Sequence, residues 1–332
     1  MPQARWRLLP LLAAALAGPA AAAGPLLLGV LRGGDDPPLL RPALSLQDGQ
    51  WTGLDNKLGE SARATGLPDF ARSNKAAPAA ATPQQLGHVL SAAAADLRQW
   101  QGRDGAGRPL MRKAVAAREM QWSCERSWGL QLDRPAGGAG DFVLLANRAL
   151  ELRAFGAIAA VDAADPAWRA ATPEQQGAAV DFYLSTAAPR PGAADAAALK
   201  TQLAAATAQT VRTSRVTLGD GRQLVAVVQQ RQAGAPEDSC AAPVLVDSAF
   251  FRIGRDGRPQ RVASQSEVQD CADGWQPGAR EEPWMWLEAE GQPYLLQWNY
   301  GVEARRLGVY KVDARTLAPG EFALASGGES GC

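Results

Sequence analysis

The chain has 332 residues, 46% of them hydrophobic, and its 34 basic and 34 acidic side chains give a formal net charge of zero. This length and composition suit one large globular domain or two ordinary ones. A nucleic-acid-binding protein usually carries a basic excess or stripe, and a helix that lies on a membrane surface carries a basic face. Because neither occurs, we expect no nucleic acid partner and no stable membrane insertion.

The first 23 residues have the pattern of a removable secretory signal. Arg5 and Arg7 precede a short apolar stretch, and Gly18-Pro19 and a run of alanines follow it. A basic start, an apolar centre and a small-residue end are typical of signal peptides, and the stretch is shorter than the about 20 residues that span a bilayer. We therefore expect an exported, soluble protein, periplasmic or secreted, cut after Ala23.

The chain has four cysteines, Cys124, Cys240, Cys271 and Cys332. An even number behind a secretory signal favours disulfides. The segment between Cys240 and Cys271 has the pattern of one hairpin whose flanks meet, so we predict that this pair is bonded, which would stabilise the fold by roughly 3–4 kcal/mol. Elimination leaves Cys124 with Cys332. The spacings fit neither a C-x-x-C redox motif nor a zinc site.

The N-terminal part of the chain predicts strands and then a helix. Residues 26–31 predict a buried strand, and residues 41–54 predict a hairpin about Asp48-Gly49, because Asp-Gly tolerates positive φ. A helix is predicted to start at Thr82, since Thr-Pro-Gln-Gln matches an N-cap, an N1 proline and an N3 glutamine. Apolar residues then recur at helical spacing as far as Trp100.

The middle of the chain alternates between strand-like and helix-like patterns. Residues 109–132 predict strands, whereas residues 142–162 fit either two strands or one buried helix. A second Thr-Pro-Glu-Gln cap at Thr172 predicts a short helix. The alanine-rich residues 193–208 predict another helix.

From residue 209 onward the pattern is almost purely antiparallel β. Three hairpins are predicted about Asp220-Gly221, Asp256-Gly257 and Glu290-Gly291, and a further strand covers residues 305–312. A two-residue turn in the first hairpin would place Val216 and Leu218 on the same side as Val225 and Val227.

These patterns predict an α+β fold that is predominantly antiparallel β, in which successive hairpins form a sandwich, a barrel or a propeller-like meander, with two or three helices. The expected organisation is a signal peptide (1–23), an N-terminal β segment (24–68), an Ala/Pro-rich linker or loop (69–82), a mixed α/β region (83–208), an antiparallel β region (209–325) and a flexible tail (326–332).

The motifs of common enzymes are absent from the sequence. His88 is the only histidine, so any Ser-His-Asp or Cys-His mechanism must use it, but we interpret it as a partly exposed helix residue. No G-x-S-x-G elbow, phosphate loop, dinucleotide fingerprint or calcium loop occurs. We therefore expect no catalytic residue, no metal and no cofactor, and we favour a protein that is not an enzyme.

The hairpin about Glu290-Gly291 carries the candidate binding residues. Alternation along its strands predicts one face that mixes indoles, amides and a carboxylate: Trp284, Trp286, Glu288, Gln297 and Asn299. Sugar rings stack on indoles while their hydroxyls bond amides and acids, and a peptide fits the same face. In the alternative, both tryptophans are ordinary core residues under a helix or a second sheet.

Three functions follow from these patterns. The first is a non-catalytic binding or envelope-associated module that takes a glycan or a peptide. The second is a secreted hydrolase that acts on polysaccharide or peptidoglycan, with Glu282 and Glu288 as carboxylates about 5–10 Å apart. The third is a protein–protein interaction or inhibitor module, which a large exposed apolar patch would favour.

Overall fold

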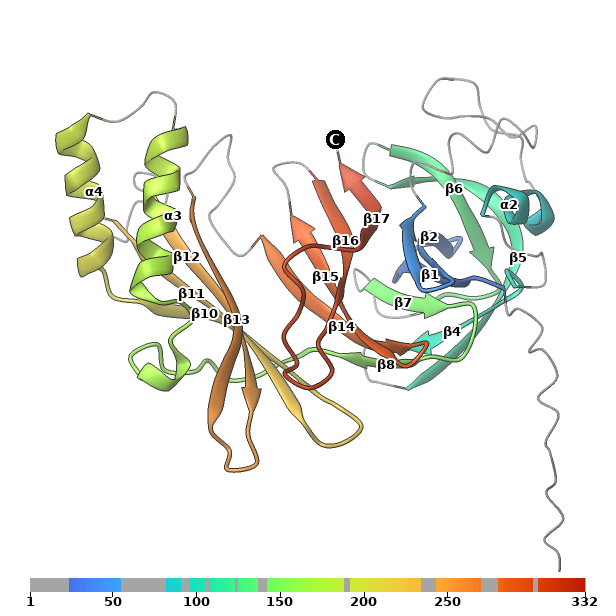
Figure 1. The fold of residues 1–332 in the computed structure, drawn as a ribbon. Coiled ribbons are helices and arrows are strands. Elements are labelled where there is room, and N and C mark those ends of the chain that lie inside the picture. Colours follow the sequence, from blue (N-terminus) through green and yellow to red (C-terminus); the bar gives the residue numbers. More distant parts are fainter. Residues whose placement is uncertain are drawn as a thin grey trace, which may run out of the picture.

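The computed structural model describes residues 24–54, 82–90, 96–104, 108–122, 125–136, 142–187, 192–233, 243–269, 280–300 and 304–331. In this part of the chain, strands account for 54% of the residues. They form a six-stranded barrel and two antiparallel meander sheets, and three α-helices accompany them (Figure 1). The predicted α+β class with predominant antiparallel β is confirmed. Residues 1–23, residues 69–81 and all four cysteines lie outside the described residues, so the signal peptide and the disulfides stay predictions.

The barrel is built from the first part of the chain. Its strand order is β1-β7-β4-β5-β6-β2, and pairing of β1 with β2 closes it. The bounds are β1 (Leu26–Arg32), β2 (Leu39–Gln47), β4 (Gln99–Arg103), β5 (Pro109–Trp122), β6 (Glu125–Leu132) and β7 (Phe142–Ala146), and β3 (Gln50–Gly53) extends the hairpin with β2.

Strand β1 shows why this part of the sequence is apolar at nearly every position. Leu27 and Leu31 point into the barrel, where they pack with Trp100 and Trp128. Leu28, on the opposite face of the strand, packs outside the barrel against another sheet. The short helix α2 (Pro83–Val89) adds Leu86 to the interior cluster, and its C-cap residue Leu90 packs there too. A strand with both faces buried has a continuous apolar sequence rather than an alternating one.

Two five-stranded sheets follow. The middle sheet has the order β17-β16-β15-β14-β8, and the outer sheet has the order β13-β12-β11-β10-β9. The middle sheet consists of β8 (Glu151–Ala154), β14 (Glu281–Ala289), β15 (Gln292–Tyr300), β16 (Ala304–Lys311) and β17 (Ala325–Gly331). The outer sheet consists of β9 (Gly156–Ala157), β10 (Gln209–Thr217), β11 (Gln223–Gln232), β12 (Val244–Ile253) and β13 (Pro259–Gln269).

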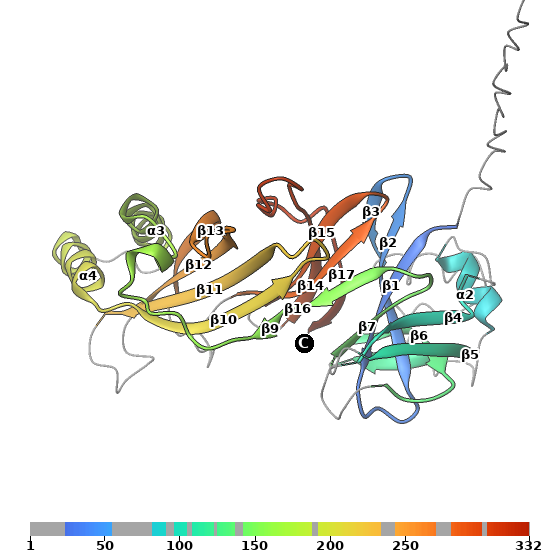
Figure 2. The same cartoon turned by 90° about the horizontal axis from the view of Figure 1, so that it is seen from below.

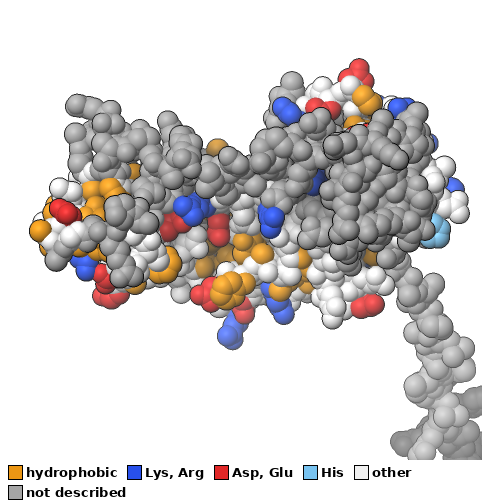
Figure 3. Space-filling view, turned by 90° about the horizontal axis from the view of Figure 1, so that it is seen from above, with side chains coloured by type: hydrophobic (Ala, Val, Ile, Leu, Met, Phe, Trp, Pro, Cys, Tyr) orange, Lys and Arg blue, Asp and Glu red, His pale blue; other side chains and the backbone are white. Residues whose placement is uncertain are grey.

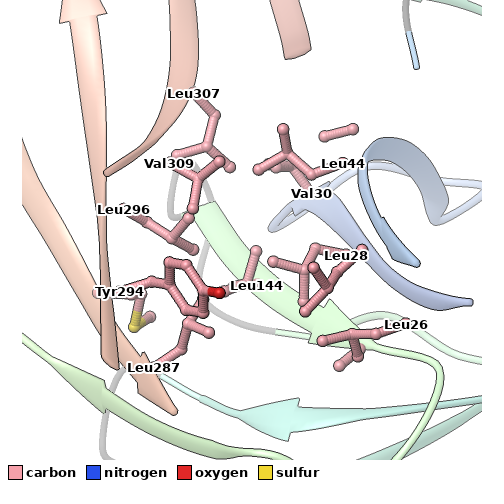
Figure 4. Close-up of a cluster of buried hydrophobic side chains, with 14 of the residues drawn as sticks. Leu26, Leu28, Val30, Leu44, Leu144, Leu287, Tyr294, Leu296, Leu307 and Val309 are labelled. Carbon is pink, nitrogen blue, oxygen red and sulfur yellow. The ribbon is translucent and has the colours of Figure 1, made fainter. Parts of the chain in front are cut away.

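The middle sheet is buried on both faces. One face packs on the outside of β1, β2 and β7, and Figure 4 shows these side chains meeting: Leu287, Tyr294, Leu296, Leu307 and Val309 against Leu26, Leu28, Val30, Leu44 and Leu144. The other face packs Trp286, Leu295 and Tyr310 against Val216 and Leu224 of the outer sheet. The middle sheet therefore joins the barrel to the outer sheet through two separate apolar clusters.

Helices cover the remaining face of the outer sheet. A 3₁₀ turn (Pro166–Trp168), α3 (Pro173–Thr186) and α4 (Ala193–Ala205) lie between β9 and β10 in the chain, and Val180 and Leu203 of the helices pack on Leu245 of β12. Strand β8 pairs with β14, and β9 pairs with β10, so one short segment links both sheets (Figure 2). The expected mixed region 83–208 is thus divided between the barrel, the two sheets and the helices.

Several local predictions are confirmed. Asp48-Gly49 and Glu290-Gly291 form two-residue turns in which all four residues have positive φ. Thr82 and Thr172 each form a capping box, with Gln85 and Gln175 respectively. Residues 142–157 contain three strands, β7, β8 and β9, and no helix. In β7, Val143 and Leu145 point into the barrel while Leu144 packs on the middle sheet.

The helix predicted from Thr82 to Trp100 is wrong beyond its first two turns. The helix ends at the C-cap Leu90, and Trp100 lies in β4, where it pairs with Arg112 of β5. Its indole Nε1 donates to the Leu97 carbonyl at 2.9 Å inside the barrel. Trp100 continues the helical spacing of apolar residues, yet it reaches the barrel core from a strand. Pairing with β5 therefore decides its structure, and the local periodicity does not.

Two other expectations also need correction. The turn at Asp220-Gly221 is a three-residue loop, closed by the Leu218 amide on the Arg222 carbonyl at 2.8 Å. Val216 therefore pairs with Leu224, and Val225 and Val227 lie in a different cluster. The expected flexible tail forms β17, which pairs with β16.

Candidate functional site

A β-bulge in β14 separates the two tryptophans that the sequence placed on one face. Pro283 is opposite Gln297 and Met285 is opposite Leu296, so Trp284 is the extra residue. Proline has no N–H for the ladder and is found in sheets at edges and bulges. Trp284 consequently lies on the barrel side, with its ring centroid 5.2 Å from that of Trp298. Pro283 was the available sequence signal for this change of parity.

Three of the predicted binding residues face the outer sheet, and two of them are buried there. Trp286 is 1% exposed and Gln297 is 2% exposed. Asn299 is partly buried and accepts a hydrogen bond from the Tyr310 hydroxyl at 2.9 Å. The alternative of an ordinary core residue therefore describes Trp286.

Asn299 and Tyr310 meet over a glycine, Gly308, whose lack of a side chain leaves room for them. A Cβ on Gly308 would lie 2.5 Å from Nδ2 of Asn299 and 2.9 Å from a ring carbon of Tyr310, so only glycine leaves the space in which they meet. Close to this group, burial raises the pKa of Glu281, and the neighbouring Glu267 raises it further.

Glu282 and Glu288 do not form a pair of catalytic carboxylates. They stand six residues apart on β14, which corresponds to roughly 20 Å along a strand, about twice the largest separation for a glycosidase. Glu282 accepts a hydrogen bond from the Tyr300 hydroxyl at 2.7 Å. Burial and that carboxylate raise the pKa of Tyr300 to about 12. Glu288 is exposed and pairs across the strands with Glu151 of β8.

Charged side chains gather between the helical end and the barrel end of the molecule, as Figure 3 shows from above. Arg212 of β10 lies 3.6 Å from Glu282 of β14, and Arg280 lies 3.6 Å from Glu267 of β13. Each of these ion pairs joins the outer sheet to the β14 side. Because the paired side chains are partly exposed, these ion pairs contribute little to stability.

Trp284 belongs to a groove between the barrel and the middle sheet, here called the barrel groove. The groove has a volume of about 900 Å³ and is lined by the end of β4, by β7, by β8 and by the start of β14. Its lining residues are Arg103, Asp104, Phe142, Leu144, Glu151, Leu152, Arg153, Ala154, Phe155, Trp284 and Met285.

Aromatic rings form one wall of the barrel groove. The Phe142 ring lies 5.6 Å from Trp298, which in turn contacts Trp284. The guanidinium carbon of Arg305 lies 4.0 Å from the centre of the Phe142 ring and 5.2 Å from that of Trp298. A cation over an aromatic face is attracted by the ring quadrupole. Partial burial lowers the pKa of Arg305. Trp284 joins this arrangement through its contact with Trp298.

Hydrogen bonds orient the charged groups of the groove. Arg153 donates from Nε to Glu151 at 2.7 Å and from Nη1 to the Thr217 carbonyl at 3.3 Å. Asp104 accepts from the backbone and the side chain of Arg108 at 2.8 and 2.7 Å. Both carboxylates in the groove are therefore held by an arginine.

The remaining candidates lie apart from the groove. His88 is exposed on the last turn of α2. Among the described residues, no three His, Cys, Asp or Glu side chains are grouped so as to hold a metal ion. No helix in the same part of the chain is long and apolar enough to span a membrane.

The sequence identified one residue of the groove and missed its neighbours. Trp284 was singled out for its indole, whereas Phe142 and Arg153 have no local signal, because only the folded chain brings β7 and β8 beside β14. Comparison of the chain with protein-family models, with curated proteins and with solved structures found no match.

Proposed function

We propose that the protein is an exported, non-catalytic binding module that holds a glycan in the barrel groove. The observation that carries the proposal is the convergence of Trp284, Phe142 and Phe155 on one groove whose lining also includes two arginines and two carboxylates. Sugar rings present apolar faces that stack on aromatic side chains, and their hydroxyls bond charged groups. Ligand sites combine apolar walls with a few placed polar groups in the same way.

The charged groups favour binding over catalysis. A general acid or base must exchange a proton with the substrate. Asp104 and Glu151 already accept hydrogen bonds from Arg108 and Arg153. Such paired groups are suited to orienting a polar ligand.

The expected location of the protein agrees with a glycan ligand. The signal-like pattern of residues 1–23 would direct the chain to the periplasm or the exterior, where envelope polysaccharide and peptidoglycan are found.

A peptide is the second candidate. Strand β8 is the edge strand of the middle sheet among the described residues, and it lines the barrel groove. An extended peptide can add to such an edge through main-chain hydrogen bonds, while its side chains fill neighbouring pockets.

The test is a calorimetric titration with peptidoglycan fragments, envelope polysaccharides and unstructured peptides. Trp284→Leu keeps an apolar side chain beside Trp298 and removes the indole. Because an aromatic contact contributes about 0.5–1.5 kcal/mol beyond burial, we expect up to about tenfold weaker glycan binding. The control is Trp168→Phe, a half-buried tryptophan beside Phe251 in the outer sheet.

Glycan binding that Trp284→Leu weakens and Trp168→Phe leaves unchanged supports the proposal. Binding of peptides alone supports the second candidate. Glycan binding that is equally strong in the parent and in Trp284→Leu would rule out the barrel groove as the site.

A further inference from the structure

A second hollow, here called the helix pocket, lies between α3, α4 and the outer sheet. It has a volume of about 180 Å³, and Val180 of α3, Leu203 of α4 and Leu245 of β12 supply apolar walls. Arg231 of β11 also lines it. Pockets for drug-sized ligands measure roughly 300–1,000 Å³, so an occupant of this pocket must be small.

Arg231 brings an unsatisfied donor to the pocket. Its Nε is buried and has no hydrogen-bond partner among the described residues. A buried donor without a partner costs about 1–3 kcal/mol. The nearby anion is Asp247, whose two oxygens already accept from Gln176 at 2.6 Å and from Ser266 at 2.7 Å. The charge of Arg231 acts on Asp247, yet the Arg231 Nε donates to neither of these oxygens and stays available to an anion in the pocket.

Gly177 indicates that the pocket is left open at a cost. It lies inside α3 and lines the pocket. Glycine in a helix interior is about 0.8–1.0 kcal/mol less favourable than alanine. A Cβ at this position would meet nothing within 4 Å, so neighbouring atoms do not require glycine there.

An ion pair sets the rim of the pocket. Lys200 of α4 lies 2.5 Å from Asp181 of α3, and both side chains are more than half exposed. This pair links the two helices and partly neutralises Lys200. Arg231 is then the cation that an occupant would meet on the floor.

We propose that the helix pocket binds a small apolar carboxylate, whose carboxylate meets Arg231 while its tail lies along Val180, Leu203 and Leu245. A plain inorganic anion would leave the apolar walls without a partner, and a neutral hydrocarbon would leave Arg231 unpaired. A short fatty acid and the C-terminal residue of a peptide share this chemistry. The inference goes beyond the proposed function, because the pocket and the barrel groove have no lining residue in common.

The test is an NMR titration of the full chain that follows the methyl signals of Val180, Leu203 and Leu245. Hexanoate represents the fatty acid and N-acetyl-leucine represents the peptide terminus, while hexanol and hexylamine serve as matched probes without a carboxylate. We expect at least tenfold weaker binding of hexanol than of the better carboxylate, and no response to hexylamine. Whichever carboxylate binds more tightly identifies the source.

Variants locate the site. Arg231→Gln should weaken carboxylate binding at least tenfold, whereas Arg258→Gln, in an exposed turn, should not change it. Gly177→Leu should fill the pocket and block binding without removing the charge, which keeps the test decisive if Arg231→Gln does not fold. Equal affinity for hexanol and hexanoate, or full carboxylate binding in Gly177→Leu, would overturn the proposal.

Discussion

Asp247 shows how one buried carboxylate couples stability to pH. It is 1% exposed, and α3 and β13 each donate one hydrogen bond to it. Burial raises its pKa above the ordinary 3.8, while those hydrogen bonds and the charges of Arg231 and Arg261 oppose the rise. The native state therefore binds this proton more tightly than the unfolded state does.

The first prediction concerns Asp247→Asn. Because the native pKa is raised, the contribution of Asp247 to the free energy of unfolding is fully present below about pH 3.8 and is lost as the pH rises through the native pKa. Asparagine does not titrate, so the free energy of unfolding of the variant, measured relative to that of the parent, should rise from pH 4 to pH 7. Urea denaturation at both pH values measures this gain.

The matched control is Asp256→Asn in an exposed turn, which should keep the pH dependence of the parent. A difference between Asp247→Asn and the parent that is the same at pH 4 and at pH 7 would show that Asp247 is not protonated preferentially in the native state.

At the scale of single elements, short-range chemistry made prediction reliable. The capping boxes at Thr82 and Thr172 and the turn at Glu290-Gly291 formed as the sequence indicated, since each depends on neighbours within four residues. Prediction failed where one extra residue shifts the alternation of side chains between the two faces of a sheet. The bulge at Pro283 places Trp284 on the other face of β14. The three-residue loop after Leu218 likewise changes which residues of β11 share a face with those of β10.

The second prediction concerns the cap of α3. The Thr172 hydroxyl accepts from the Gln175 amide at 3.2 Å, and Gln175 also accepts from the Ser264 hydroxyl at 3.1 Å. Thr172→Ala should lower the free energy of unfolding by about 1 kcal/mol. Thr186→Ala, which removes an exposed hydroxyl at the other end of α3, should cost less.

Thermal or chemical denaturation of the two variants measures these costs. If Thr172→Ala were no more destabilising than Thr186→Ala, the capping box would not contribute to holding α3 on the outer sheet.

At the scale of the whole molecule, strand pairing over long sequence distances decides the architecture. Leu31 of β1 pairs with Val143 of β7, and Leu40 of β2 pairs with Leu130 of β6; alternation within a strand does not specify such partners. The strand content and the successive hairpins were therefore predictable, but closure of the barrel was not. The barrel groove was missed for the same reason, since its walls come from β4, β7, β8 and β14.

The position of the barrel groove has a consequence for its rigidity. Its floor is the apolar cluster that joins the barrel to the middle sheet, in which Leu28, Leu144, Leu287 and Leu296 are fully buried. A ligand held at the mouth of a packed interface meets a site that is largely formed before binding, which lowers the entropic cost of association. Phe142 and Trp284 both pack against this apolar cluster.

The most direct test of the account is amide hydrogen exchange of the full chain with and without a saturating peptidoglycan fragment. We predict slower exchange in β7, in β8 and at the start of β14 on ligand binding, with α3 and α4 unchanged. Slower exchange confined to α3, α4 or the outer sheet, or no change around Trp284, would contradict the assignment of the barrel groove as the glycan site.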